Sequence, residues 1–125
     1  MNITSLTKQQ VAKTVISQLE EQSYELSVQT GLLNSYSSSP QITTQSSRDV
    51  FSPDILTIEQ NGETNIYEIQ LNSKIDAEKW RIFSHYTKVR QGELFIIVPE
   101  PNLSAAEEAI IKNDIRNIKL MYVPN

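Results

Sequence analysis

The dipeptide Asn61-Gly62 stands between two runs of alternating residues and constrains the fold more than any other feature of the sequence. The runs are Asp54 to Glu59 and Asn65 to Leu71, and an Asn-Gly pair between such runs is typical of a β-hairpin. In both runs the two alternate sets of side chains are largely apolar. Both faces of the hairpin are therefore expected to be covered, which predicts that it lies in the centre of a sheet.

The length of the hairpin loop decides which side chains meet across the two strands. A two-residue loop at Asn61-Gly62 would place Asp54 opposite Ile69 and turn Glu68 to the other face. A three-residue loop, Gln60 to Gly62, requires a left-handed residue at its last position, where Gly62 stands. We therefore predict the second register, in which Asp54 lies opposite Glu68.

In this register one face of the hairpin ends in polar side chains. That face carries Leu56, Ile58 and Ile66 with Asp54, Glu68 and Gln70 at its end, and the other carries Ile55, Tyr67, Ile69 and Leu71. Opposite carboxylates on paired strands have Cβ atoms about 5 Å apart and repel each other. A hard divalent cation such as Mg²⁺ would relieve the repulsion, whereas at a solvated strand end the pair would cost little. The hairpin alone leaves both interpretations open.

The other periodic segments predict the order α-β-β-β-α-β-α-β. Capping boxes, Thr7 with Gln10 and Ser104 with Glu107, mark the starts of two helices. Ser73 and Gly92 delimit the helix between them. The expected helices span 7–21, 73–91 and 104–113, and the expected strands span 24–29, 54–59, 65–71, 94–98 and 118–123. This order predicts an α/β fold, with a mixed central β-sheet flanked by helices on both faces.

A chain of 125 residues is most simply one domain, 1–125. The segment at about 31–50 is rich in Ser, Thr, Gln and Asn and is expected to be a long polar loop. It is either a plain linker or a loop that touches a substrate or a partner subunit.

Composition excludes several classes of protein. The chain has no cysteine, which rules out disulfides and cysteine-ligated metal sites. No apolar run is long enough to span a membrane, and the first ten residues lack the pattern of a signal peptide, so a cytoplasmic protein is expected. The net charge of −4 argues against a general nucleic-acid binder, although a local basic stripe runs from Lys74 to Arg90.

Ser52-Pro53-Asp54, the hairpin, and Glu68-Ile69-Gln70 together resemble the PD-(D/E)xK nuclease superfamily, whose domain is the restriction-endonuclease-like core. The resemblance extends from the first helix to Val98. It implies that Asp54, Glu68 and the carbonyl of Ile69 hold Mg²⁺ or Mn²⁺, which activates water against a phosphodiester. A first-helix acid often joins such sites, and Glu20 or Glu21 matches by position.

The departure from the superfamily pattern is at Gln70, where lysine is usual. That lysine's charge helps to stabilise the transition state, and glutamine can only donate a hydrogen bond. Some members resemble this chain in having Glu-x-Gln. Lys74 or Lys79, from the following helix, could supply the missing charge.

The expected helix after the motif carries most of the basic residues. Its apolar period consists of Ile75, Ile82, Tyr86 and Val89, and the candidate DNA-binding residues are Lys74, Lys79, Lys88 and Arg90. The basic residues are either a phosphate-binding stripe or an ordinary solvated face. Trp80 and Phe83 lie outside the apolar period and are expected to pack, stack on bases or form a dimer contact. His85, the only histidine, is either structural or a general base.

Two functions follow from the resemblance. The first is a Mg²⁺-dependent endonuclease that cleaves DNA, with Asp54, Glu68 and Gln70 as its catalytic residues and a homodimer as its expected assembly. The second is a catalytically inactive module of the same fold that binds DNA or joins a larger assembly. A third interpretation, without the resemblance, is an interaction protein in which Asp54 and Glu68 point to opposite faces.

Overall fold

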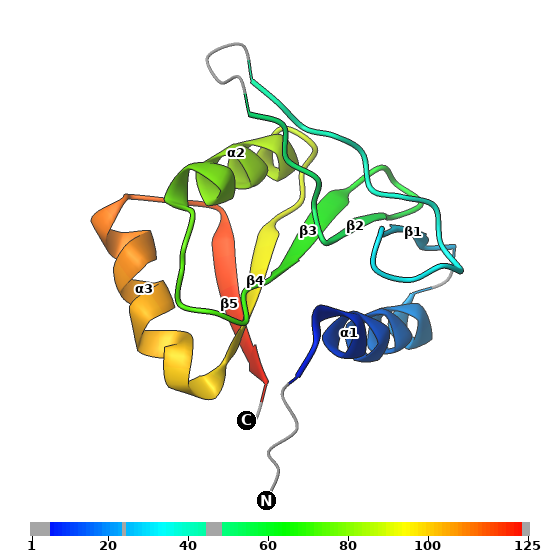
Figure 1. Ribbon diagram of the computed structural model, residues 1–125. Helices are drawn as coiled ribbons and strands as arrows, with labels where there is room; N and C mark the ends of the chain where they lie inside the picture. Colours follow the sequence, from blue (N-terminus) through cyan, green and yellow to red (C-terminus); the bar gives the residue numbers. More distant parts are fainter. Residues whose placement is uncertain (1–5, 24, 45–48, 124–125) are drawn as a thin grey trace, which may run out of the picture.

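Five strands form one mixed sheet in the order β1-β2-β3-β4-β5 (Figure 1). The computed structural model describes residues 6–23, 25–44 and 49–123. The strands are β1 (Ser27–Gln29), β2 (Ile55–Ile58), β3 (Thr64–Ile69), β4 (Leu94–Pro99) and β5 (Ile118–Val123). β1 to β3 pair antiparallel, whereas β3, β4 and β5 run parallel to one another. The central strand β3 therefore has one antiparallel and one parallel neighbour.

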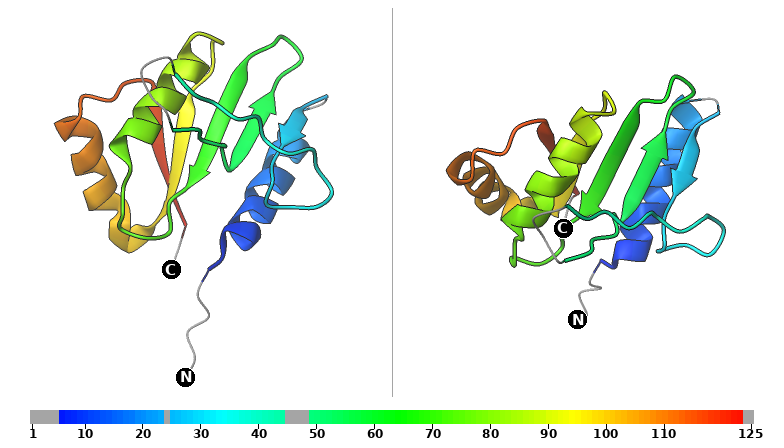
Figure 2. Two further views of the ribbon diagram at one scale, coloured as in Figure 1. Left: turned by 45° about the horizontal axis from the view of Figure 1, so that its top comes forward. Right: turned by 90° about the horizontal axis from the view of Figure 1, so that it is seen from above.

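Helices cover both faces of the sheet (Figure 2). The helix α1 (Lys8–Gln22) packs on one face, and α2 (Ala77–Lys88) and α3 (Leu103–Lys112) pack on the other. A short 3₁₀ helix, η1 (Glu100–Asn102), precedes α3. These observations confirm the predicted α/β class, the mixed sheet and the order of elements. Within the described part of the chain, no helix has the length and apolar character needed to cross a membrane.

The register of the β2–β3 hairpin is the one predicted from Gly62. Leu56 pairs with Ile66, and Ile55 pairs with Tyr67. Gly62 has a φ of +92°, and its N–H donates to the carbonyl of Glu59 at 2.9 Å. A left-handed residue at the end of a three-residue loop is what this hairpin type requires. The loop thus sets which faces the two acidic side chains can reach.

The helix α1 begins where its capping box predicts. Thr7 Oγ1 accepts from the N–H of Gln10 at 3.2 Å, and Gln10 Oε1 accepts from the N–H of Thr7 at 2.8 Å. The predicted strand after this helix is shorter than expected, and its first residue, Tyr24, lies outside the described residues.

The predicted start of the second helix at Ser73 is wrong. The helix α2 begins at Ala77, and Asp76 caps it by accepting from the N–H of Lys79 at 3.1 Å. The preceding residues form a turn because Gln70 Nε2 donates to the carbonyls of Asn72 and Lys74. Side-chain bonds to the backbone compete with helix formation here.

Gly92 was predicted to end α2 as its left-handed residue, and the structure gives it another role. The left-handed residue after the helix is Gln91, with a φ of +65°. A Cβ on Gly92 would lie 1.7 Å from the carbonyl oxygen of Thr64, the first residue of β3. Glycine is therefore required by the close approach of two backbones and not by the helix end.

The predicted apolar period of α2 is confirmed in part: Ile75, Ile82 and Tyr86 are partly buried and pack against the core. The most deeply buried face of the helix consists of Trp80, Phe83, Ser84 and Thr87. Trp80 and Phe83 are fully buried in the core shared with β3, β4 and α3. They pack, and this burial excludes them from stacking on bases or forming a dimer contact. Val89, predicted to be in the apolar period, is 60 % exposed.

The predicted capping box at Ser104 is wrong. The helix α3 begins one residue earlier, at Leu103, directly after η1, and no side chain caps its N-terminus. Pro101 within η1 favours the helical φ at that point and lets the chain enter α3 without a cap. The end near Asn113 and the strand β5 agree with prediction.

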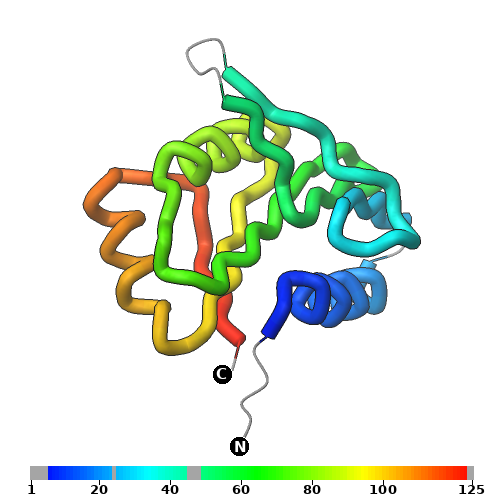
Figure 3. Tube along the Cα trace, in the orientation of Figure 1, coloured from blue at the N-terminus to red at the C-terminus, as the bar shows by residue number. Residues whose placement is uncertain are grey.

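The predicted polar loop lies alongside the sheet and reaches α2 (Figure 3). No helix or strand forms in its described part, and residues 45–48 lie outside the description. Ile42 and Phe51 pair through two backbone hydrogen bonds, and Phe51 packs edge-on against Phe83. These contacts fix the end of the loop just before Asp54, where the chain enters the sheet.

Candidate functional site

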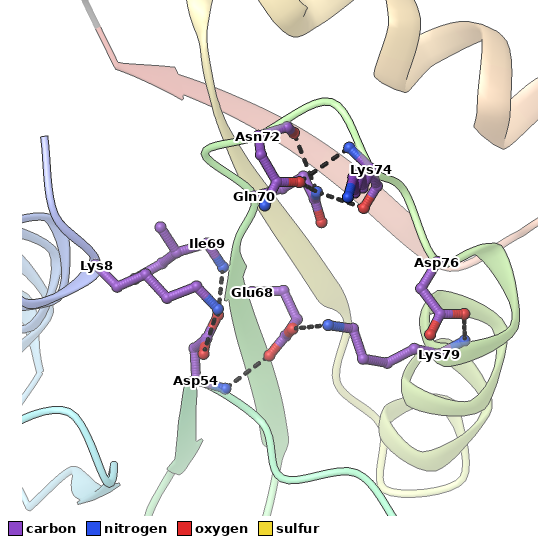
Figure 4. A network of polar contacts seen from close by, with 9 residues as sticks. All are labelled: Lys8, Asp54, Glu68, Ile69, Gln70, Asn72, Lys74, Asp76 and Lys79. Carbon is purple, nitrogen blue, oxygen red and sulfur yellow. Dashed lines mark hydrogen bonds and ion pairs between the residues drawn. The ribbon is translucent and has the colours of Figure 1, made fainter. Parts of the chain in front are cut away.

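Asp54 and Glu68 meet at the end of the β2–β3 hairpin (Figure 4). The N–H of Asp54 donates to Oε1 of Glu68 at 2.6 Å. In return, Oδ2 of Asp54 accepts from the N–H of Ile69 at 2.9 Å. Each carboxylate thus binds the backbone of the opposite strand, beyond the last ladder pair of the sheet. Beyond these bonds the two carboxylates pair with lysines from helices on opposite faces of the sheet, Asp54 with Lys8 of α1 and Glu68 with Lys79 of α2.

Glu68 is a carboxyl group in a buried position. The residue is 3 % exposed and lies on the face of the sheet that α2 covers. Burial, together with the charge of Asp54, raises the pKa of Glu68 to about 7, against the lowering effect of Lys79. A buried carboxyl group with a perturbed pKa beside a second acid is typical of functional sites.

Lys79 supplies a positive charge to this site from α2. Its Nζ lies 3.2 Å from Oε2 of Glu68, and its side chain is 23 % exposed. Lys79 stands in the first turn of the helix, whose start is set by the Asp76 cap. The capped turn therefore places the ammonium of Lys79 beside Glu68.

Lys8 supplies a second positive charge, which the sequence analysis did not identify. Its Nζ lies 3.1 Å and 3.2 Å from the two carboxylate oxygens of Asp54. Lys8 is the first residue of α1, so the Thr7 capping box fixes its position. The capping box was the one feature of the sequence that could have placed Lys8 at the start of α1. It does not indicate which end of α1 lies over the hairpin.

Gln70 and Lys74 turn to the loop that leads to α2. The amide nitrogen of Gln70 donates to Asn72 and to the carbonyl of Lys74, and it makes no recorded bond with Asp54 or Glu68. Lys74 is exposed. Of the two lysines expected to replace the missing charge, Lys79 is the one that contacts Glu68.

The backbone of Ile69 lies on the Asp54 side of β3. Its N–H donates to Asp54, whereas the N–H of Gln70 donates to Ile97 of β4. Because both polar backbone groups of a strand residue point to the same side, the carbonyl of Ile69 also points to the Asp54 side. Asp54, Glu68 and this carbonyl are therefore gathered at one strand end.

The structure places Glu20 and Glu21 away from the two acids. Glu20 lies 12 residues along α1 from Lys8, about 18 Å at the rise of an α-helix. Its carboxylate accepts from the hydroxyl of Tyr36 at 3.1 Å. The end of α1 that faces the site is its N-terminus, which brings a lysine and not an acid.

The remaining basic residues of the stripe are spread along α2. Lys88 ends the helix and is exposed, and Arg90 stacks on the ring of Tyr86 at 3.5 Å. His85 is exposed and lines a surface hollow with Arg81. Among the predicted DNA-binding residues, Lys79 is the one that forms an ion pair with Glu68.

The strand end offers oxygen donors for a cation, but the described residues contain no full set of protein ligands. Among the described residues, no group of three or more His, Cys, Asp or Glu side chains could hold a metal ion. Mg²⁺ is commonly bound through one or two carboxylates, with waters and substrate phosphates as its other ligands. Asp54, Glu68 and the carbonyl of Ile69 fit that description.

Comparisons with known proteins give no further assignment. No family model matches the chain, and no curated protein or solved structure is significantly similar to it.

Proposed function

We propose that this chain is a Mg²⁺-dependent DNA endonuclease of the PD-(D/E)xK type with a restriction-endonuclease-like core. The observation that carries the proposal is the meeting of Asp54, Glu68 and Lys79 at one strand end. Two acids and a lysine are the groups that the superfamily pattern requires. Here the lysine comes from α2, which offsets the departure at Gln70.

Asp54, Glu68 and the carbonyl of Ile69 would hold the ion. The bound ion would supply a water of lowered pKa for attack on a phosphodiester. Lys79 would stabilise the negative charge that develops on the scissile phosphate, since its ammonium already lies beside Glu68. Lys8 would contact the same phosphate or its neighbour once the ion takes its place beside Asp54.

The positive charge needed for DNA binding is local. The chain as a whole carries −4, so a general field does not attract DNA. Lys8 and Lys79 place two cations beside the acids, and Lys74, Lys88 and Arg90 are the further residues that would contact the backbone. With so few phosphate contacts, the affinity for DNA would be low and would decrease only modestly with salt.

The proposal is tested by incubating plasmid and single-stranded DNA with the protein in Mg²⁺ or Mn²⁺. Cleavage is expected from the wild type and from Glu107→Gln, an exposed acid on α3 that serves as control. Asp54→Asn and Glu68→Gln are expected to abolish it. Cleavage that persists in both variants, or its absence in the wild type on every substrate, contradicts the proposal.

One observation favours the second function, a nuclease-fold module without activity. Asp54 and Glu68 each accept a backbone N–H and each pair with a lysine, so their charges are already compensated. A compensated pair can serve structure alone. Mg²⁺ titration of thermal stability separates the two functions, because an ion that binds the folded state raises the melting temperature. An unchanged melting temperature favours the inactive module.

A further inference from the structure

The outer edge of β5 is an open edge of the sheet. β5 is six residues long, and within the described residues it pairs only with β4. At the opposite edge β1 has three residues, and a bridge between Gln29 and Ser37 covers it. A long edge presents unpaired N–H and carbonyl groups, to which another strand can add.

The direction of the backbone groups along β5 identifies the residues that offer them. The carbonyl of Asn117 accepts from the N–H of Leu94, so Asn117 and every second residue after it point to β4. Ile118, Leu120 and Tyr122 therefore direct their N–H and carbonyl groups outward. These three residues form the hydrogen-bonding edge available to a partner.

Apolar side chains flank this edge on both faces of the sheet. On the α3 face, a groove of about 460 Å³ is lined by Leu103, Ile110, Ile111, Ile118, Leu120 and Tyr122, together with Glu107. On the α1 face, Leu6 and Met121 line a second groove. Six large hydrophobic residues of the described chain are exposed, and Leu6, Ile111, Met121 and Tyr122 are four of them. Exposed apolar side chains thus gather around β5, which is typical of an interaction surface.

The edge is complementary to a second copy of itself. Two antiparallel β5 strands related by a two-fold axis at Leu120 would pair Ile118 with Tyr122 and Leu120 with its counterpart. All three outward-pointing residues then form hydrogen-bonded pairs, as an antiparallel ladder requires. The apolar side chains on the α3 face of the two copies would meet across the axis.

The charges along β5 allow this register. Lys119, the only charged residue of the strand, would lie opposite Met121 of the second copy. Its Nζ already pairs with Glu93 at 3.2 Å, so it brings no uncompensated charge to the edge. A register centred on Lys119 would oppose two lysines and is disfavoured.

We propose that two copies of this chain associate through antiparallel pairing of their β5 edges, centred on Leu120, so that the two sheets become one. The partner is a second copy because the register satisfies every outward backbone group and opposes no like charges. This interface uses none of the residues at the Asp54–Glu68 site and stands whether or not the chain cleaves DNA.

The first test is the mass in solution, by light scattering after size exclusion over a range of protein concentrations. The expected result is twice the 14.2 kDa of the monomer at high concentration. Hydrogen exchange is measured on the same samples, and the amides of Leu120 and Tyr122 are expected to gain protection with concentration. A monomer at every concentration, or a dimer that leaves these two amides unprotected, overturns the proposal.

The second test uses Tyr122→Pro. Proline removes the outward N–H of Tyr122 and leaves the β4 ladder intact, because proline is tolerated on an edge strand where its missing N–H faces solvent. The variant is expected to be a folded monomer by circular dichroism. The control is Val89→Glu, at a residue of similar exposure outside β5, and it is expected to remain dimeric.

Tyr122→Glu keeps the N–H and places a charge beside the axis, so it provides an independent check. The proposal expects it to weaken the dimer at least tenfold in Kd. A dimer of unchanged affinity in both Tyr122 variants overturns the assignment to the β5 edge.

Discussion

The N–H of Asp54 donates to Oε1 of Glu68 at 2.6 Å, so the carboxyl group of Glu68 is bound to the backbone of the neighbouring strand. This carboxyl group is buried and also holds Lys79. It therefore has a structural role that does not depend on a metal. Variants at Glu68 have to separate that structural role from any catalytic one.

Replacing Glu68 is expected to affect stability in a graded way. Glu68→Ala leaves the N–H of Asp54 and the ammonium of Lys79 without their partner, and we expect a loss of about 1–3 kcal/mol in the free energy of unfolding. Glu68→Gln retains an acceptor for the N–H and is expected to cost less. Urea unfolding followed by the fluorescence of the buried Trp80 measures both. Equal losses in the two variants would show that the hydrogen bond contributes nothing.

Stability is expected to depend on pH through Glu68. The pKa of this group rises from 4.5 to about 7 on folding, so between those values the folded protein retains a proton that the unfolded chain has lost. The stabilisation from the protonated group is therefore complete below about pH 4.5 and disappears as the pH rises to about 7. The difference in unfolding free energy between wild type and Glu68→Gln should change across this window. A difference that is constant with pH contradicts the shift.

Lys79→Met is expected to lower DNA cleavage by about 10² to 10³, the usual effect of removing one group that stabilises transition-state charge. The matched control is Lys13→Met, because Lys13 is an exposed lysine on α1 to which no contact with the acids or with DNA is assigned. Initial cleavage rates at saturating DNA measure both. In the same variant the pKa of Glu68 should rise further, since Lys79 lowers it. Equal rates for the two variants would remove Lys79 from the proposed mechanism.

Lys8→Gln is expected to tighten Mg²⁺ binding by about two- to fivefold, because the lysine and the ion compete for Asp54 and an exposed ion pair is weak. Calorimetric titration of Mg²⁺ measures the change without requiring cleavage. The control is Lys13→Gln, at an exposed lysine five residues further along α1. Weaker Mg²⁺ binding in Lys8→Gln than in the control would mean that Lys8 supports the ion and does not compete with it.

Gly92→Ala is expected to destabilise the fold by several kcal/mol, because the new Cβ would collide with the backbone of Thr64. Gly31→Ala is the control, since nothing lies within 4 Å of the Cβ added there. Thermal unfolding of the two variants should give a large decrease for Gly92→Ala and little change for Gly31→Ala. Similar melting temperatures would contradict the close approach of α2's end to β3.

The sequence predicted features that depend on local spacing. The left-handed requirement at Gly62 selected the hairpin register, and that register brought Asp54 and Glu68 together. The capping box of Thr7 and Gln10 predicted the start of α1 correctly, because its donors and acceptors lie only three residues apart in the sequence.

Features that depend on tertiary contacts were not predictable in this way. The full burial of Trp80 and Phe83 depends on the strands and on α3, which pack against α2 from elsewhere in the chain. The collision that requires glycine at position 92 involves Thr64, which lies in another strand. The contact of Lys8 with Asp54 spans 46 residues and depends on the direction in which α1 crosses the sheet.

The short hairpin loop also has a consequence for the order of folding events. Asp54 and Glu68 are 14 residues apart, and closing so short a loop costs little entropy, whereas Lys8 must be recruited across 46 residues. We expect the two acids to come together before Lys8 arrives, so the folding barrier includes their mutual repulsion. Refolding should therefore accelerate when the carboxyl groups are protonated or when salt screens them.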